Sequence, residues 1–105
     1  MAIKEITVDE LAGRVAEGAR VIDVREPAEF EQARLGGSEL IPLGTVPERI
    51  DDFRGDGPTY VICRSGGRSM KACEFLAQQG VDVVNVSGGM MAWISSAGDY
   101  VSGPT

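Results

Sequence analysis

Residues 60–69 read Tyr-Val-Ile-Cys-Arg-Ser-Gly-Gly-Arg-Ser, so an apolar run ends in a cysteine, a glycine pair and the start of an amphipathic segment. This order predicts a buried strand, a tight turn and the first turn of a helix. The thiol of Cys63 then lies at a helix N-terminus, where unpaired backbone N–H groups lower the pKa of a thiol. Arg64 and Arg68 place positive charge nearby. We therefore expect Cys63 to be a nucleophile in an anion-binding loop.

The same order of strand and helix recurs along the chain. Thr7 and Glu10 have the spacing of a capping box, and Pro27 suits the first turn of a helix. Strands separated by helices imply right-handed crossovers and a parallel sheet with helices on both faces, so the predicted fold class is α/β. The strands are expected at residues 3–6, 20–24, 38–42, 59–63 and 81–86, and the helices at 7–17, 27–32, 47–53, 67–79 and 89–96.

Length and charge limit the possible functions. A chain of 105 residues with 43% hydrophobic content is sized for one domain, and its glycines and proline predict that residues 97–105 form a loose tail. The formal charge of −6 argues against a nucleic-acid or anionic-membrane partner. However, the segment from Cys63 to Cys73 contains no acid and three bases. This local excess of positive charge favours a small anionic substrate or an acidic partner surface.

The cysteine and histidine counts restrict the chemistry further. Two cysteines, short apolar runs and an N-terminus without the features of a signal or transit peptide predict a cytoplasmic protein. The chain has no histidine, which excludes a Cys-His dyad, a Ser-His-Asp triad and any histidine-containing metal site. We expect no metal and no cofactor, and we expect backbone or arginine groups to activate Cys63. Cys73 lies on the predicted core face of its helix, so we expect it to pack in the core. A role as a resolving thiol is the alternative.

Four segments together resemble the single-domain rhodanese family. They are Val-Ile-Asp-Val-Arg-Glu-Pro-Ala-Glu-Phe at 21–30, Ile-Pro-Leu at 41–43, Cys-Arg-Ser-Gly-Gly-Arg-Ser at 63–69, and Val-Asn-Val-Ser-Gly-Gly-Met-Met-Ala-Trp at 84–93. The resemblance implies a five-stranded parallel sheet in the order 1-5-4-2-3. It also implies a persulfide-forming cysteine that moves sulfane sulfur from thiosulfate or a protein persulfide to a thiophilic acceptor, either a thiol or a protein.

The loop itself suits this chemistry. Successive N–H groups curled around the thiol can hold the outer sulfur of a persulfide as an anion, and glycines permit such a curl. Either flanking arginine could attract thiosulfate and stabilise the departing sulfite. We therefore expect Cys63 to be catalytic and the following residues to bind substrate: Arg64, Ser65, Gly66, Gly67 and Arg68. Asp23, Arg25 and Ser69 are expected to support the site, and the first two more by bonding to backbone or to each other than by touching substrate.

Two other functions remain open. Cysteine-dependent phosphatases and arsenate reductases also hold a thiolate in a loop of amides, but their arginine follows the cysteine by six positions. Here position 69 is serine and the arginine comes one place earlier, a loop length that favours sulfur over a tetrahedral oxyanion. A non-catalytic sulfur carrier or interaction module is the further alternative, which the presence of Cys63 disfavours.

One segment departs from the rhodanese pattern. Where related sequences commonly read Gly-His-Ile, this chain has Ala-Arg-Leu at 33–35, followed by Gly-Gly-Ser. We expect the change to remove an imidazole hydrogen bond between loops and to weaken local stability, without affecting the chemistry of Cys63.

Overall fold

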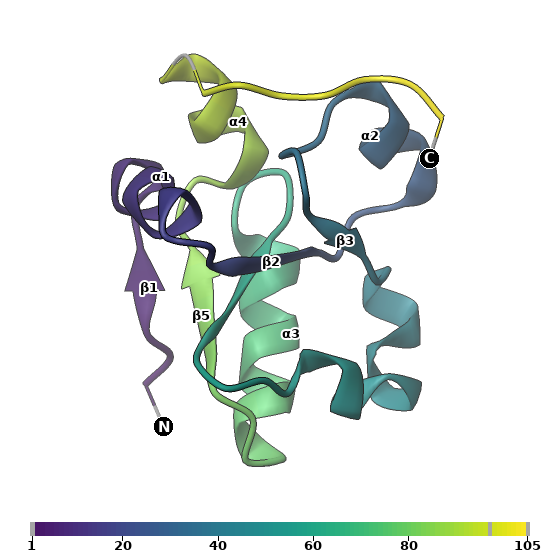
Figure 1. Cartoon of the computed structure of the whole chain (residues 1–105). Helices are drawn as coiled ribbons and strands as arrows, with labels where there is room; N and C mark the ends of the chain where they lie inside the picture. Colours follow the sequence, from purple (N-terminus) through teal and green to yellow (C-terminus); the bar gives the residue numbers. More distant parts are fainter. Residues whose placement is uncertain (1, 97, 105) are drawn as a thin grey trace.

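The computed structural model describes residues 2–96 and 98–104, and its centre is one parallel sheet of five strands (Figure 1). Their order is β1-β5-β4-β2-β3, which confirms the predicted topology and fold class. Each strand is shorter than predicted, because the flanking residues lie in turns and loops. The strands are β1 (Glu5–Ile6), β2 (Arg20–Asp23), β3 (Glu39–Leu40), β4 (Thr59–Ile62) and β5 (Val83–Val86).

Helices connect the strands as expected. They are α1 (Val8–Ala16), α2 (Pro27–Gln32), α3 (Gly67–Gln78) and α4 (Gly89–Ser95). The Thr7 hydroxyl accepts from the Glu10 N–H at 3.2 Å and the Glu10 carboxylate accepts from the Thr7 N–H at 3.2 Å, so the predicted capping box is present. Within the described residues, no helix combines the length and the apolar character that a membrane span requires.

The helical patch predicted around residues 47–53 is present but begins earlier. It consists of two 3-10 helices, η1 (Leu43–Glu48) and η2 (Ile50–Phe53). Pro47 lies inside η1, where a missing N–H and a bulky ring disfavour a regular α-helix.

Alternate residues of the central strands build two separate cores. On β4, Val61 packs with α3, η1 and η2, whereas Tyr60 and Ile62 pack with α1 and α4. Every residue of β4 is buried, as expected of a parallel strand that is covered on both faces. Cys63 follows β4 and belongs to the core that contains α3. The active-site candidate therefore begins inside the core, at the carboxyl edge of the sheet.

The segment expected to be a loose tail is held to the domain where the structure describes it. Val101 pairs with Arg34 through two backbone hydrogen bonds of 2.8 Å, and the Trp93 indole N–H donates to the Asp99 carbonyl at 2.8 Å. Ala97 and Thr105, which also belong to the predicted tail, lie outside the described residues. Glycine and proline content gave the wrong expectation, because the pairing of Val101 with Arg34 joins positions far apart in the sequence.

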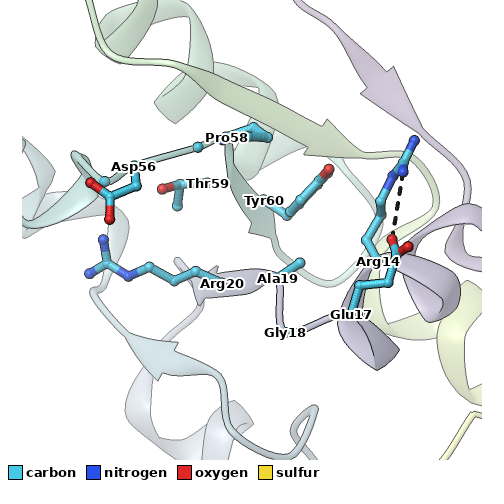
Figure 2. Close-up of a pocket in the computed structure, with 11 residues that line it drawn as sticks. Arg14, Glu17, Gly18, Ala19, Arg20, Asp56, Pro58, Thr59 and Tyr60 are labelled. Atoms are coloured by element: carbon cyan, nitrogen blue, oxygen red, sulfur yellow. Dashed lines mark ion pairs between the residues drawn. The ribbon is translucent and has the colours of Figure 1, made fainter.

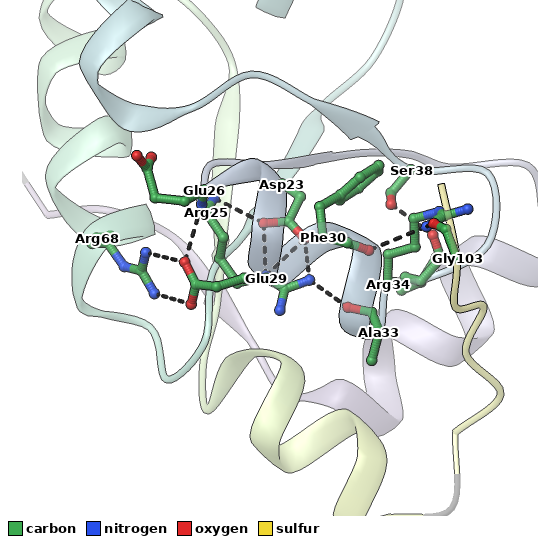
Figure 3. Close-up of polar contacts among 11 residues, drawn as sticks. Asp23, Arg25, Glu26, Glu29, Phe30, Ala33, Arg34, Ser38, Arg68 and Gly103 are labelled. Atoms are coloured by element: carbon green, nitrogen blue, oxygen red, sulfur yellow. Dashed lines mark hydrogen bonds and ion pairs between the residues drawn. The ribbon is translucent and has the colours of Figure 1, made fainter. Parts of the chain in front are cut away.

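Arg34, at the departure from the rhodanese pattern, supplies contacts of its own. Its guanidinium lies 5.1 Å from the centre of the Phe30 ring and donates to the carbonyls of Phe30 at 3.2 Å and Gly103 at 2.7 Å (Figure 3). The arginine thus connects α2 to the chain that follows α4, in the segment where we expected weakened local stability.

We predict that Leu76→Ala lowers the free energy of unfolding by about 3 kcal/mol, because it leaves a cavity between α3 and the sheet. Leu76 is fully buried, whereas Gln78 on the same helix is exposed, so Gln78→Ala is the control, with a change within about 0.5 kcal/mol. Urea denaturation of both variants makes the comparison. Equal stabilities would contradict the assignment of α3 to the core.

Candidate active site

Cys63 lies directly after β4 and is only 1% exposed. Residues 64–66 then turn the chain, and α3 begins at Gly67. Gly66 has a φ of 111°, a left-handed conformation that side chains other than glycine rarely adopt. The sequence therefore places a thiol at the first turn of a 12-residue helix, as predicted.

Hydrogen-bond donors surround the sulfur. The Gly66 N–H donates to Cys63 Sγ at 3.1 Å, and the Ser69 hydroxyl lies 3.3 Å from the same atom. Burial by itself raises the pKa of the thiol, since a buried thiolate loses hydration. The Ser69 hydroxyl and the N–H groups of Ser69, Gly66 and Ser65 outweigh burial, and the pKa of Cys63 is lowered from its usual value of 9.0. The thiolate is therefore more populated at neutral pH than in an ordinary cysteine.

The two predicted cations have different environments. Arg68 forms a two-pronged ion pair with Glu29, at 2.7 and 2.9 Å (Figure 3). Arg64 is exposed and forms no ion pair with any residue in 2–96 or 98–104. The sequence led us to expect that both backbone N–H groups and arginine charge lower the pKa of Cys63. In the structure the lowered pKa comes mainly from hydrogen bonds.

Asp23 and Arg25 form a buried pair that ties β2 to α2. The Arg25 guanidinium donates to both Asp23 carboxylate oxygens, with the shortest distance 2.8 Å, and also to the Ala33 carbonyl at 2.6 Å (Figure 3). The Asp23 carboxylate accepts from the Arg25 N–H at 2.9 Å as well. Both residues bond to each other and to backbone, the pattern that we expected of supporting residues.

The start of α4 is hydrogen-bonded to the loop that follows Cys63. The Met90 N–H donates to the Cys63 carbonyl at 2.8 Å, and the Met91 N–H donates to the Arg64 carbonyl at 3.0 Å. Gly89 has a φ of 56°, and a Cβ on it would lie 2.4 Å from the Cys63 carbonyl oxygen. Only glycine permits so close an approach of the two backbones.

Comparison with known proteins identifies the family, since a model of the rhodanese-like domain matches residues 7–96. The chain belongs to the rhodanese-like domain family. YtwF of Bacillus subtilis is 41% identical over 95 residues, which cover 89% of this chain and 92% of that protein. Thiosulfate sulfurtransferase GlpE of Pseudomonas putida is 36% identical over 81 residues, which cover 76% of this chain and 74% of GlpE.

A solved structure agrees with this assignment. The crystal structure of a rhodanese-related protein from Thermoplasma volcanium has a TM-score of 0.87 at 34% identity, and the match covers 93% of this chain and 97% of that one. The resemblance inferred from the sequence motifs is confirmed, and it places this chain in a family that includes sulfurtransferases.

A groove of about 420 Å³ lies beside the loop of this rhodanese-like domain. The helix α4 contributes apolar side chains to its lining, including Met91 and Ile94, which are 52% and 41% exposed. The polar lining residues come from α2, from Arg25 before it and from Arg64 in the loop. The lining residues are Arg25, Glu29, Gln32, Ala33, Arg64, Met90, Met91 and Ile94.

Another hollow, of about 300 Å³, lies where β2 and β4 begin (Figure 2). Arg20 and Thr59, the first residues of these parallel strands, contribute to its wall, and an Arg14–Glu17 ion pair of 3.7 Å flanks it. Cys63 follows the other end of β4, so this hollow is at the wrong edge of the sheet to serve the thiol.

Sequence reasoning missed two residues that support the rhodanese-like loop. Asn85 donates to the Gly66 carbonyl at 3.3 Å and to the Glu5 carboxylate at 2.9 Å. A single amide inside the apolar run of β5 was the available signal. Glu29 was quoted only as part of a motif, and nothing in the sequence indicated that it pairs with Arg68. Gly89 was expected to form a turn, and its contact with the loop was not foreseen.

We predict that Ser69→Ala slows alkylation of Cys63 by iodoacetamide at pH 7 about tenfold, because a hydrogen bond to a charged group contributes about 1.5 kcal/mol. The exposed Ser95, at the end of α4, provides the control Ser95→Ala. Unchanged alkylation of a folded Ser69→Ala protein would show that the hydroxyl does not stabilise the thiolate.

We predict that Gly89→Ala destabilises the domain by more than about 1 kcal/mol and moves the pH midpoint of Cys63 alkylation upward, because the added methyl group displaces the loop. Gly13→Ala is the control. The added Cβ would have no heavy atom within 4 Å apart from its own helix and chain neighbours, and alanine favours the helix α1. Urea denaturation and the pH dependence of alkylation measure the two effects. A Gly89→Ala protein that keeps the wild-type midpoint would refute the role of this contact.

Proposed function

We propose that this protein is a sulfurtransferase in which Cys63 carries sulfane sulfur as a persulfide. The observation that carries the proposal is a nearly buried thiol that receives donors from Gly66 and Ser69 at the start of α3. Such a site stabilises a sulfur anion without any histidine. The family assignment supports the same class of reaction.

The reaction has two steps. The Cys63 thiolate attacks the outer sulfur of a donor such as thiosulfate, a new S–S bond forms, and sulfite leaves with the electrons of the broken S–S bond. An acceptor thiolate then attacks the outer sulfur of the persulfide, and the Cys63 thiolate is the leaving group. Loop N–H groups hold the negative charge in each state, as an oxyanion hole does for oxygen.

The expected substrate-binding residues have distinct roles in this proposal. Arg64 is exposed at the rim and attracts an anionic donor, whereas Ser65, Gly66 and Gly67 shape the loop around the outer sulfur. Arg68 is bound to Glu29 and contributes less to donor binding. Thiosulfate is the first donor to test, because a relative is named as a thiosulfate sulfurtransferase.

The acceptor uses the groove beside the loop in this proposal. Because Cys63 is nearly buried, an acceptor reaches the outer sulfur of the persulfide and not Sγ itself. The exposed Met91 and Ile94 offer apolar contacts to a small thiol or to a protein that presents one. The first step needs Cys63 as a free thiolate, and the second step regenerates it, so we place the protein in a reducing compartment such as the cytoplasm.

The short loop disfavours the phosphatase and arsenate reductase alternative. Gly66, three residues after the cysteine, donates to Sγ at 3.1 Å, and the loop reaches its arginine at position 68, one place earlier than the phosphatase spacing. A tetrahedral oxyanion needs a wider ring of donors.

We predict that reduced wild-type protein gains the mass of one sulfur atom on incubation with thiosulfate and loses it when cyanide or a thiol is added. Cys63→Ser should gain nothing, because the attacking thiolate is missing. Intact-mass spectrometry measures both.

Cys73→Ala is the matched control for that experiment. Cys73 is fully buried, and burial raises its pKa to about 12, so its thiol is not reactive and the variant should still gain one sulfur. Sulfur uptake by Cys63→Ser would overturn the assignment. If the wild type gains no sulfur while Cys63 alkylates readily, a phosphate or arsenate enzyme, or a carrier loaded by a specific protein, becomes the better reading.

A further inference from the structure

Glu29 neutralises a cation next to the thiol. The Arg68 guanidinium donates to both Glu29 carboxylate oxygens, at 2.7 and 2.9 Å, and the two side chains are only 35% and 29% exposed. The hydrogen bonds from Arg68 outweigh partial burial and lower the pKa of Glu29 to about 2, so this carboxylate is charged at any physiological pH. The pair joins α2 to the first turn of α3 (Figure 3).

Two other arginines line the groove, and they differ in their partners. Arg25 is bound to Asp23 at 2.8 Å, and both are buried. In the described part of the chain, Arg64 lines the groove without an ion-pair partner. A loop with two arginines therefore presents little more than one positive charge to an incoming donor.

We propose that Glu29 determines which donors the loop accepts, by cancelling the charge of Arg68 so that donors with a single negative charge are used in preference to dianions. The inference rests on the proposed sulfur transfer and assigns a specificity-determining role to Glu29. A donor approaches a loop that already holds the negative charge of the Cys63 thiolate, and the neutral pair of Glu29 and Arg68 offsets neither that charge nor the donor's. With Arg68 cancelled, each further negative charge on the donor increases the repulsion.

Two small donors separate charge from chemistry. Thiosulfate carries two negative charges, and its leaving group is sulfite. Methanethiosulfonate carries one negative charge, and its leaving group is methanesulfinate. In both reactions the Cys63 thiolate takes the terminal sulfur, the donor's S–S bond breaks, and its electron pair leaves with the sulfonyl fragment. Each reaction ends with the Cys63 persulfide, so the change in donor charge is the main difference at the site.

The first test is Glu29→Gln, which keeps the size of the side chain and an acceptor oxygen for the Glu26 N–H that Glu29 binds at 3.0 Å. Because Coulomb energy scales with charge, kcat/KM should rise about fourfold with thiosulfate and about twofold with methanethiosulfonate. Glu31→Gln is the matched control, because Glu31 is exposed on the same helix and the change in net charge is identical. Its two values should stay at the wild-type level. Equal gains with both donors, or no gain, in folded Glu29→Gln would overturn the inference.

A second test does not depend on sulfur transfer. Iodoacetate and iodoacetamide alkylate the same thiolate but differ by one negative charge, so their rate ratio at Cys63 reports the local potential. The rate with iodoacetate divided by the rate with iodoacetamide should increase in Glu29→Gln and remain unchanged in Glu31→Gln. It should return toward the wild-type value in Glu29→Gln/Arg68→Gln. An unchanged ratio in Glu29→Gln would also overturn the inference.

The two tests distinguish this inference from the proposed function. If the wild type takes sulfur from neither donor, the proposed function fails and the alkylation ratio alone decides whether Glu29 controls the charge at the loop. If the wild type takes sulfur from both donors and Glu29→Gln leaves their ratio unchanged, the proposed function stands and the inference fails.

Discussion

Holding negative charge on a sulfur that is almost excluded from water is the constraint on which the rest of this structure depends. Burial opposes ionisation of Cys63, so donors must outweigh it. The left-handed turn at Gly66 aims an N–H at the sulfur, and Ser69 adds a hydroxyl one helical turn further on. Because these groups belong to the turn and to α3, the fold itself supplies them.

Charge is compensated in pairs around this loop, although the chain as a whole is acidic. Asp23 with Arg25, and Glu29 with Arg68, connect the ends of β2, α2 and α3. Each pair fixes a neighbouring segment and at the same time removes a net charge from the mouth of the site. The net charge of −6 therefore says little about the potential at the thiol, which depends on a few side chains.

The sequence predicted most of the architecture because local signals and hydrophobic patterns decide it. The capping box at Thr7, the apolar run of β4 and the glycines at 66 and 67 each have a direct structural meaning. The strand order came from the resemblance to rhodaneses, since no pattern within a strand specifies its neighbours. Local signals failed where distant positions meet. The Glu29 and Arg68 pair, the amide of Asn85 behind the loop, and the pairing of Val101 with Arg34 depend on the folded chain.

The hydrogen bonds from Met90 and Met91 to the loop also set the stage of folding at which the site is complete. A ribosome releases the segment around Cys63 well before the segment around Gly89, so the thiol emerges before the amides that hold its loop. Until β5 joins the sheet and α4 docks, the carbonyls of Cys63 and Arg64 lack these partners. The loop with all of its backbone partners therefore exists only after α4 has docked.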